Sequence, residues 1–493
     1  MKIKLKKFSA FAAEILPHEA DYLCNIQQFE DTQKVEILKR IRENAHQQQS
    51  GLPYNTEINK RKYSNLMDWI QKRLDDIDVD KYFQWINEMD RKVITDAITH
   101  EEEKQPFLLM SDAITHEEEK LLLRRIKRYR HPIHNFMKFY EMVINYRHYL
   151  LIRLRYKDYQ DVDLFINKYE AQYKYSKEVN LKLNEATVDI IHQFKDKTAD
   201  PKQWEDWLLG LFDDSQLDGY NRYMAIIRLT FLYFNTREFN KLKQLYDQLD
   251  KLLCEGLFYT RRILYNYYAN RLMLHSKFDI LQQAEEYGYL SIRQKNADHV
   301  LYLSNFSSIL IRRGKIEEAL NLLKESFAEV QKSNNFYHKI GFISFYIKCL
   351  NLSNQPQRGE MLGDSFLRLH KDEILNQRWY TFFTAYIQGL IKQEKYHKVF
   401  QVFKKYNLIN KDQDDSEKSI YLPTIRWYYE VARVKVGKMD WKELVDSIVN
   451  FSGEYVSDPH KSFVLNQVLS ELETYVPRTV VAAKSRLYHK ELA

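Results

Sequence analysis

Two histidine-glutamate pairs resemble the start of a zinc-protease helix. Such a helix places a second histidine four residues after the first, so that both imidazoles bind the metal from one face. After His100-Glu101 and His116-Glu117, the residues at that position are Lys104 and Lys120. Because the second ligand is missing in both copies, we do not expect either segment to hold zinc.

Three aspartates, Asp76, Asp78 and Asp80, alternate along the chain as in a calcium-binding loop. Such a loop needs a glycine for its sharp turn and a closing glutamate that binds the ion with two oxygens. Lys81 and Asn87 stand at those two positions. We therefore interpret the aspartates as solvated carboxylates near a helix end.

A third group of candidate ligands consists of His131, His134 and His148. The first two straddle Pro132, but no nearby thiol or obvious carboxylate completes a metal-ligand set. The chain also lacks a phosphate-binding glycine loop and a dinucleotide fingerprint, and it has only 12 glycines in 493 residues. We expect no bound cofactor, no metal and no enzymatic activity.

The three cysteines, Cys24, Cys254 and Cys349, are far apart and show no C-x-x-C spacing. This usage is typical of buried thiols in a reducing compartment. The apolar run from Phe8 to Leu16 is short and contains Glu14, so we do not expect a signal peptide. No stretch approaches the roughly 18 apolar residues that a membrane span needs. The sequence predicts a cytoplasmic protein without membrane contact.

Positive charge is concentrated in residues 121–160, whereas the preceding segment, Thr95–Lys120, is acidic. The candidate patch for an anionic partner is Arg124, Arg125, Lys127, Arg128, Arg130, Arg147, Arg153 and Arg155. Tyrosines that could stack on bases interleave with these cations, namely Tyr129, Tyr140, Tyr146, Tyr149 and Tyr156. A structural interpretation competes with nucleic-acid binding, because acidic and basic helix ends complement the helix dipole and neighbouring helices pair.

Long helices are expected to position these groups, because glycine (12) and proline (9) are scarce. Asp31 is a plausible cap for an early helix, and apolar residues at helical spacing predict helices over 63–74 and 81–94. Two long helices are expected over 133–195, meeting near residues 156–159, and short helical pieces over 198–219. We interpret residues 1–130 as a helical bundle and 131–220 as long basic helices with a connector.

A nine-residue segment is duplicated inside the predicted bundle. Asp96–Lys104 recurs letter for letter as Asp112–Lys120, and each copy contains the Thr-x-x-Glu pattern of a capping box. The offset of 16 residues rotates a helix by about 160°, so the copies cannot share one buried face. We predict that the second copy starts a helix near Glu117 and that the first is a looped-out tandem insertion.

From Asn221 to about Asp446, an aromatic-rich helix, a short polar turn and a second amphipathic helix recur six times. The predicted turns fall at Arg237, Ser276, Gly314, Asn354, Glu394 and Val436, which are 39, 38, 40, 40 and 42 residues apart. A nearly constant period in this range is typical of stacked helical hairpins, none of which can bury its apolar face alone. We predict repeats over 221–456 and capping helices over 457–493.

One repeat, with Leu303, Phe306, Ser307, Leu310, Gly314, Ala319 and Leu323, resembles the tetratricopeptide repeat family in the spacing of its packing residues, turn glycine and small second-helix residue. The family's first-helix packing positions recur as Ile226, Leu229, Tyr233; Tyr265, Tyr268, Leu272; Ile343, Tyr346, Leu350; Phe383, Tyr386, Leu390; and Ile425, Tyr428, Ala432. The chain departs from the family in its longer period and in Ile347, Ile387 and Tyr429, where small residues are expected. The resemblance implies an all-α superhelix with looser hairpins.

The resemblance also implies that the first helices line a concave groove. Its inward-facing positions, four residues apart in each hairpin, hold Asn266 and Asn270, Ser304 and Ser308, Ser344 and Lys348, Thr384 and Gln388, and Arg426 and Glu430. In the first hairpin Ile227 and Phe231 stand there, which suggests that preceding helices cover them.

These ten residues, here called the polar stripe, could hold an extended peptide or form an ordinary wet surface. The sequence therefore predicts a scaffold or adaptor that binds a protein or peptide. Its alternative is a nucleic-acid-associated regulator that uses the basic segment.

Overall fold

The computed structural model describes residues 5–47, 51–102, 114–196, 200–416, 422–456 and 459–488, and every regular element in them is a helix. This confirms the all-α prediction. The chain divides into two compact units, residues 1–264 and 265–493, and the division falls within helix α12 (Arg261–Lys277). The first hairpin of the predicted repeats therefore belongs to the first unit, together with the predicted bundle.

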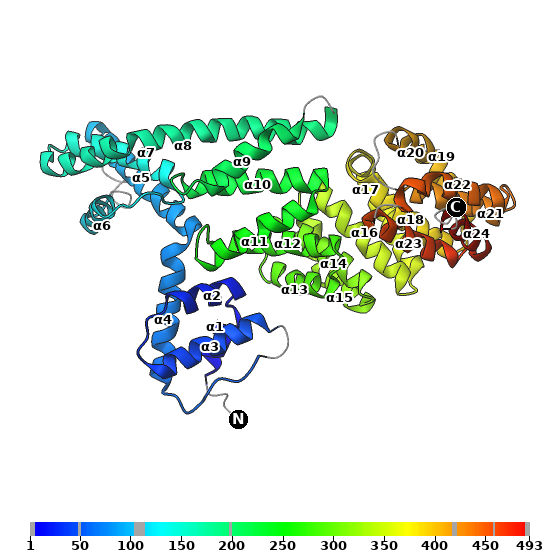
Figure 1. The fold of residues 1–493 in the computed structure, drawn as a ribbon, viewed down its shortest axis with the longest axis horizontal. Helices are drawn as coiled ribbons and strands as arrows, with labels where there is room; N and C mark the ends of the chain where they lie inside the picture. The colour runs from blue at the N-terminus through cyan, green and yellow to red at the C-terminus, as the bar shows by residue number, and fades with distance from the viewer. Residues whose placement is uncertain are drawn as a thin grey trace. The chain divides into compact units, whose positions relative to one another are not determined.

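The first unit contains eleven complete α-helices and one short 3-10 helix among its described residues (Figure 1). They are α1 (Lys6–Ala13), α2 (Pro17–Ile26), α3 (Thr32–His46), α4 (Lys60–Ile77), α5 (Val79–Glu102), α6 (His116–Lys127), α7 (Phe136–Ile152), α8 (Tyr156–Asp196), η1 (Pro201–Trp204), α9 (Glu205–Asp213), α10 (Gly219–Thr236) and α11 (Phe239–Cys254). The predicted helices of the N-terminal half and the short connector pieces are confirmed, and Asp31 caps α3 by accepting a hydrogen bond from Gln33 N at 3.0 Å.

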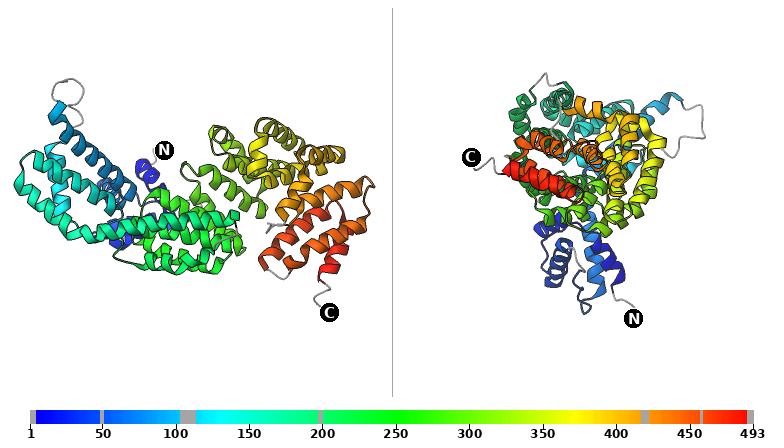
Figure 2. Two further views of the ribbon diagram at one scale, coloured as in Figure 1. Left: turned by 90° about the horizontal axis from the view of Figure 1, so that it is seen from above. Right: turned by 90° about the vertical axis from the view of Figure 1, so that its right-hand side faces the viewer.

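An aromatic core holds α5, α6, α7 and α8 together. Phe136, Phe139 and Tyr146 of α7 are fully buried in it, beside Val93 of α5 and Val162 of α8. The 41-residue α8 packs on α7 near its start and on α10 further along, as Figures 1 and 2 show. Helix α6, which carries the start of the basic segment, is thereby fixed against the rest of the first unit.

The two copies of the duplicated segment have different positions in their helices. Residues 96–102 continue α5, whereas the second copy begins α6 at His116. Thr115 accepts a hydrogen bond from Glu118 N, and the Glu118 carboxylate accepts one from Thr115 N at 2.8 Å, which confirms the predicted capping box. The prediction that the first copy loops out is wrong for residues 96–102, which extend α5, and residues 103–113 lie outside the described residues.

Inter-helix turns from distant parts of the first unit bond to one another. Val79 N donates to Tyr259 O at 2.9 Å, and Asn135 Nδ2 donates to Val79 O at 2.7 Å. Tyr220 N donates to His134 O at 3.0 Å. These bonds join the start of α5 to the loops before α7, α10 and α12, so the first unit depends on contacts between residues far apart in sequence.

The second unit consists of consecutive helices that pack mainly on their near neighbours in sequence. Its helices after α12 are α13 (Leu281–Ser291), α14 (His299–Arg312), α15 (Ile316–Lys332), α16 (Phe336–Leu352), α17 (Pro356–Gln377), α18 (Trp379–Lys392), α19 (Tyr396–Tyr406), α20 (Leu408–Ser416), α21 (Thr424–Lys435), α22 (Trp441–Val456), α23 (Pro459–Glu473) and α24 (Pro477–Tyr488). Helix α14 packs on α15 and α16, α16 packs on α17 and α18, and α18 packs on α19 and α21.

The same backbone turn closes the first helix of all six predicted hairpins. One residue adopts the left-handed conformation, and the next donates its N–H to the carbonyl five residues back, as in a Schellman motif. The left-handed residues are Arg237, Asp279, Gly314, Asn354, Glu394 and Gly437. Four predicted turn positions are thus confirmed to the residue, while the others shift from Ser276 to Asp279 and from Val436 to Gly437.

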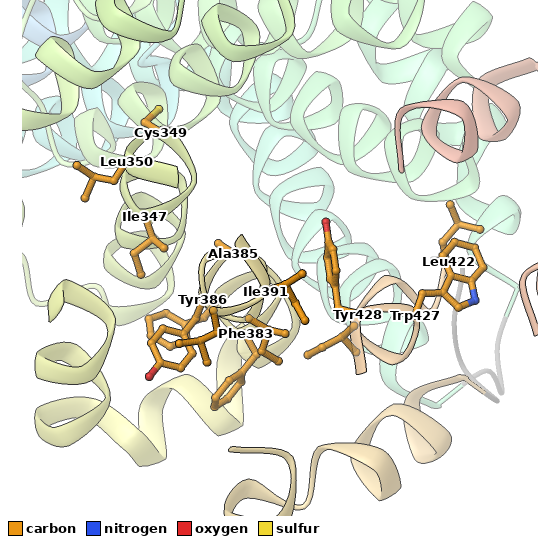
Figure 3. Close-up of a cluster of buried hydrophobic side chains, with 14 of the residues drawn as sticks. Ile347, Cys349, Leu350, Phe383, Ala385, Tyr386, Ile391, Leu422, Trp427 and Tyr428 are labelled. Atoms are coloured by element: carbon orange, nitrogen blue, oxygen red, sulfur yellow. The ribbon is translucent and has the colours of Figure 1, made fainter. Parts of the chain in front are cut away.

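The predicted first-helix packing positions form the core of the repeats. All of them are buried except Tyr346, which is partly buried. Figure 3 shows buried side chains from three successive first helices: Ile347 and Leu350 of α16, Phe383 and Tyr386 of α18, and Tyr428 of α21. The hydrophobic spacing was therefore a correct guide to which residues each helix buries.

Glycines on a second helix explain how bulky first-helix residues fit at tight contacts. Ile347, where the resemblance leads us to expect a small residue, is fully buried against α17. A Cβ added to Gly363 of α17 would lie 3.5 Å from Ile347 Cδ1 and only 2.4 Å from Tyr386 Cδ2. The space that a small first-helix residue would leave is supplied here by the facing helix.

Candidate partner-binding surfaces

The polar stripe lies on α12, α14, α16, α18 and α21, one pair of residues per helix, but none of its ten side chains is exposed. Ser304, Ser344 and Gln388 are buried, with 2%, 2% and 4% of their surface accessible. The other seven are partly buried, Lys348 among them. The stripe is therefore not the openly solvated surface that the sequence left as one alternative.

Hydroxyl groups of the stripe bond to their own helices. Ser304 Oγ donates to Val300 O at 2.9 Å, Ser344 Oγ to Ile340 O at 2.7 Å, and Thr384 Oγ1 to Tyr380 O at 2.7 Å. Ser308 Oγ donates to Asn305 O at 2.6 Å. A hydroxyl that already donates to the preceding turn has only its lone pairs left for a ligand.

The two ends of the stripe are also engaged within the chain. Asn270 Nδ2 donates to Asn266 Oδ1 at 2.8 Å, and Arg426 forms a 2.9 Å salt bridge with buried Asp412. Burial raises the pKa of Glu430, although the nearby Ser447 hydroxyl and the charge of Arg426 oppose that rise. These contacts favour a structural role for both ends.

The first hairpin does not have the covered inner face that its sequence suggested. Ile227 is partly buried, but Phe231 remains 48% exposed. Helix α10 contacts α8, α9 and α11, and these helices do not enclose Phe231. The prediction that preceding helices cover this position is wrong for Phe231.

Most cations of the basic segment are engaged in internal contacts. Lys127 and Arg147 form salt bridges of 2.8 and 2.9 Å with Asp161 and Asp163 of α8. Arg155 bonds to buried Glu119 at 2.5 Å and to Asp158 at 2.6 Å. These pairs fasten α6 and α7 to α8 and the start of α8 to α6, which agrees with the structural interpretation of the charge pattern.

The remaining cations of this segment differ in exposure. Arg125 lies over Trp85, 3.9 Å from the ring centroid, and Arg153 lies over Tyr149 at 5.5 Å. Arg124, Arg128 and Arg130 are exposed. Lys127 and Arg153 are exposed as well, so the outward-facing part of the predicted patch consists of the end of α6 and Arg153 at the end of α7.

The tyrosines of the basic segment are mostly core residues. Tyr140, Tyr146 and Tyr149 are buried, and Tyr129 stacks on Phe139 with ring centroids 5.6 Å apart. Tyr156 is 59% exposed. Because buried rings cannot stack on bases, Tyr156 alone of the five retains the role that the nucleic-acid alternative requires.

The sequence patterns for metal sites have other roles. Asp78 Oδ1 accepts from Asp80 N and Lys81 N at the start of α5, and Asp80 pairs with Arg262 at 2.9 and 3.0 Å. The helix-end interpretation of these aspartates is therefore confirmed for Asp78. In the described parts of the chain, neither the aspartate series nor His131, His134 and His148 brings three ligand atoms together.

His134 instead lines a cavity of about 420 Å³ in the first unit. The cavity lies among the turns before α5, α7, α10 and α12, with Asp78, Tyr82, Arg222 and Phe258 in its wall. Burial lowers the pKa of His134 to about 4, and Arg262 adds to this effect while Asp80 opposes it. The imidazole is therefore neutral near pH 7 and packs its ring edge to face against Phe258.

A second cavity, of about 500 Å³, lies between α17 and α19 and is here called the α17–α19 cleft. Leu367, Val402, Tyr386 and Tyr406 supply its apolar and aromatic lining. Its other lining residues are Asp364, Arg368, Lys371, Lys398, Gln401 and Lys405. The cleft thus combines an apolar floor with a predominantly cationic rim.

The cations of the cleft are not equivalent. Lys398 forms salt bridges of 2.7 Å with Glu360 and 2.8 Å with Asp364. Burial lowers the pKa of Lys398, but the hydrogen bonds to these carboxylates outweigh burial and raise it above its usual value. Arg368, Lys371 and Lys405 are exposed. These three supply the positive charge that Asp364 and Glu360 do not balance.

The sequence analysis did not find the α17–α19 cleft, because its cations lie on second helices rather than on the predicted groove face. The available signal was the pair Arg368 and Lys371, three residues apart in sequence on either side of a backbone kink at His370, with Lys405 one repeat later. Without the packing of α17 against its neighbours, such pairs cannot be distinguished from other surface charges.

Comparisons with known proteins give no further assignment. No protein-family model matches the chain, and no curated protein sequence matches it significantly. Among the described residues, no helix is both long enough and apolar enough to cross a membrane.

Proposed function

We propose that this chain is a binding protein without enzymatic activity, which acts as a scaffold or adaptor by holding an acidic segment of a protein partner in the α17–α19 cleft. The observation that carries the proposal is the cleft itself, with a volume of about 500 Å³, an apolar floor and three exposed cations. Its size falls in the range of roughly 300–1,000 Å³ that is usual for ligand sites.

The cleft fits a short acidic peptide that also carries apolar side chains. Leu367 and Val402 are buried below the rim and offer an apolar contact, while Arg368 on α17 and Lys405 on α19 face the occupant from two helices. Attraction between the cationic rim and an acidic peptide raises the association rate, and repulsion selects against basic partners. The polar stripe is a weaker candidate, because several of its donors are already used within the chain.

The proposal includes a tetratricopeptide-like solenoid architecture for the repeats. The support is the recurring left-handed turn and the packing of each first helix on the next, from α14 through α16 and α18 to α21. In such arrays each repeat contacts mainly its neighbours and presents an extended surface for binding. We also propose a cytoplasmic location, since all three cysteines are free thiols.

A labelled peptide that alternates glutamate with leucine tests the proposal. The full chain should bind it in fluorescence anisotropy, with an affinity that falls as salt rises, and should not bind the matching lysine-leucine peptide. Replacing Arg368, Lys371 and Lys405 together by serine should weaken binding at least about tenfold, since each lost charge contact is worth about 0.5 kcal/mol or more.

A matched control removes the same charge elsewhere. Serine at Arg124, Arg128 and Arg130, all exposed on the first unit, should leave peptide binding unchanged. Equal weakening by both triple variants would show that binding depends on net charge alone, and no binding by the unmodified chain would reject the cleft. The same control tests the nucleic-acid alternative: filter retention of single-stranded RNA at low salt, lost in this variant only, would favour that alternative.

A further inference from the structure

A cluster of potential metal ligands lies where α2 meets α11. One atom each from His18, Asp250 and Cys254 lies within 4.8 Å of the other two, and His18 Nε2 is 3.0 Å from Asp250 Oδ1. His18 is 6% exposed, and the other two residues are partly buried. Of the described residues, these alone form a close group of three such ligands.

Helix geometry explains how residues more than 230 positions apart come together. Asp250 and Cys254 are four residues apart on α11, so both project from one face. Helix α2 packs on α11, as Figure 1 shows, and its His18 lies close to Asp250 and Cys254. The site therefore rests on two regular helices, which hold ligands more firmly than loops do.

A possible fourth ligand, the carboxylate of Asp21, lies on α2 one turn after His18. Asp21 Oδ2 lies 3.9 Å from Cys254 Sγ. Arg42 and His46 of α3 bond to the Asp21 carboxylate at 2.5 and 3.1 Å. Partners of this kind, behind a ligating carboxylate, fix its orientation at metal sites.

We propose that His18, Asp250 and Cys254 bind a divalent transition-metal ion of the zinc class, with Asp21 or water as the fourth ligand. A mixed set of imidazole, thiolate and carboxylate suits zinc, whereas calcium and magnesium require oxygen ligands. Bond lengths of about 2.0–2.3 Å to a tetrahedral zinc separate its ligand atoms by roughly 3.3–3.8 Å. His18 Nε2 and Asp250 Oδ1 are 3.0 Å apart, and no two of the three ligand atoms are more than 4.8 Å apart, so small side-chain rotations complete the geometry.

The expected role of the ion is to fasten the N-terminal helices to the first repeat hairpin. The ligands on α2 belong to the N-terminal bundle, and those on α11 belong to the second helix of that hairpin. On binding, the Cys254 thiol releases its proton to solvent and the sulfur binds as thiolate. This inference concerns the first unit and is independent of the α17–α19 cleft in the second.

Cobalt(II) provides the test, because it takes zinc sites and reports its ligands by absorption. The full chain, stripped with a chelator and titrated with cobalt(II) chloride, should bind one equivalent with a thiolate charge-transfer band and tetrahedral ligand-field bands. Zinc should displace both sets of bands. Zinc should also raise the melting temperature, since it binds the folded state alone.

Variants distinguish this site from other thiols and from loose surface binding. Cys254→Ser should abolish the charge-transfer band, and His18→Gln or Asp250→Asn should weaken binding at least about tenfold, in line with the loss of a ligand. Cys349→Ser removes a buried thiol of the second unit, and Cys24→Ser removes a thiol that lies 4.0 Å from Leu38 O. Both controls should bind cobalt as the parent does.

The inference is overturned if cobalt gives no thiolate band with the full chain, or if Cys254→Ser retains it. It is also overturned if His18→Gln and Asp250→Asn, each with an unchanged far-ultraviolet circular dichroism spectrum, bind cobalt as tightly as the parent. Because these two variants leave every cysteine in place, the test still decides if Cys254→Ser fails to fold.

Discussion

The two units use different means to hold helices together. In the first unit, distant segments meet directly: Glu19 accepts hydrogen bonds from Tyr259 at 2.6 Å and from Arg261 at 2.8 Å, more than 200 residues away. In the second unit, the corresponding bonds join neighbouring repeats, as when Lys392 Nζ donates to Asn351 O at 2.6 Å.

This difference predicts different responses to damage. If the second unit is the proposed solenoid, it loses stability locally, because the free energy of unfolding of such an array is nearly a sum over repeats and their interfaces. A unit fastened by a few long-range polar clusters loses the attachment of whole segments when one cluster fails. Three experiments test this difference between the units.

The largest expected effect is at Glu19, whose side chain is fully buried and paired with Arg261. Glu19→Ala removes the buried carboxylate that pairs with the Arg261 guanidinium and accepts from the Tyr259 hydroxyl, and should cost about 3–5 kcal/mol. Hydrogen exchange should show faster exchange throughout the first unit and unchanged protection in α14–α18. Glu14→Ala is the control, since that side chain is exposed and Arg261 bonds only to its backbone carbonyl.

The next effect is a pH dependence of the first unit that arises from His134. The folded pKa of about 4 lies below the usual histidine pKa of 6.5, so the unfolded state binds the extra proton first. Neutral His134 therefore contributes at most about 3 kcal/mol to the free energy of unfolding. This contribution is fully present above about pH 6.5 and is lost as pH falls toward 4.

Urea denaturation between pH 8 and 4.5 measures this contribution. His134→Phe keeps an aromatic ring against Phe258 and should flatten the pH dependence relative to the parent chain, whereas exposed His148→Gln should not. Identical slopes for all three proteins would mean that other groups carry the acid sensitivity of the first unit.

The smallest of the three effects concerns a glycine of the second unit. Gly363→Ala places a methyl group 2.4 Å from the Tyr386 ring and should destabilise the contact of α17 with α18 by about 1–3 kcal/mol. Gly453→Ala in α22, with no atom within 4 Å of the added Cβ, should be neutral or stabilising by up to about 1 kcal/mol. Faster hydrogen exchange confined to α16–α18 in Gly363→Ala would support a local loss of stability. Faster exchange across the whole second unit would contradict it.

Features that repeat along the chain could be predicted from the sequence, because helix periodicity and turn spacing are local. The positions buried by each first helix and the capping box at Thr115 belong to this class. The back-bonding of Ser304 and Ser344 was also accessible in principle, since a serine within a helix commonly bonds to the preceding turn.

Features made by packing could not be predicted in this way. The meeting of His18 with Cys254 depends on α2 lying against α11, and no pattern within either helix encodes that contact. The cleft cations Arg368 and Lys405 likewise become neighbours of one cavity only when α17 and α19 are placed. Sequence periodicity therefore located the core better than it located the binding surfaces.

The recurring left-handed turn also limits which residues can occupy its positions. The hydrogen bond that closes each turn is donated by the backbone N–H of the residue after the left-handed one. Proline, which has no N–H, is therefore excluded at Glu238, Ile280, Lys315, Gln355, Lys395 and Lys438. The left-handed residue itself is arginine, aspartate, asparagine, glutamate or glycine, and never β-branched. The six residues therefore differ in charge and size but share one backbone shape, so we expect substitutions among these residue types to leave the path of the helices unchanged.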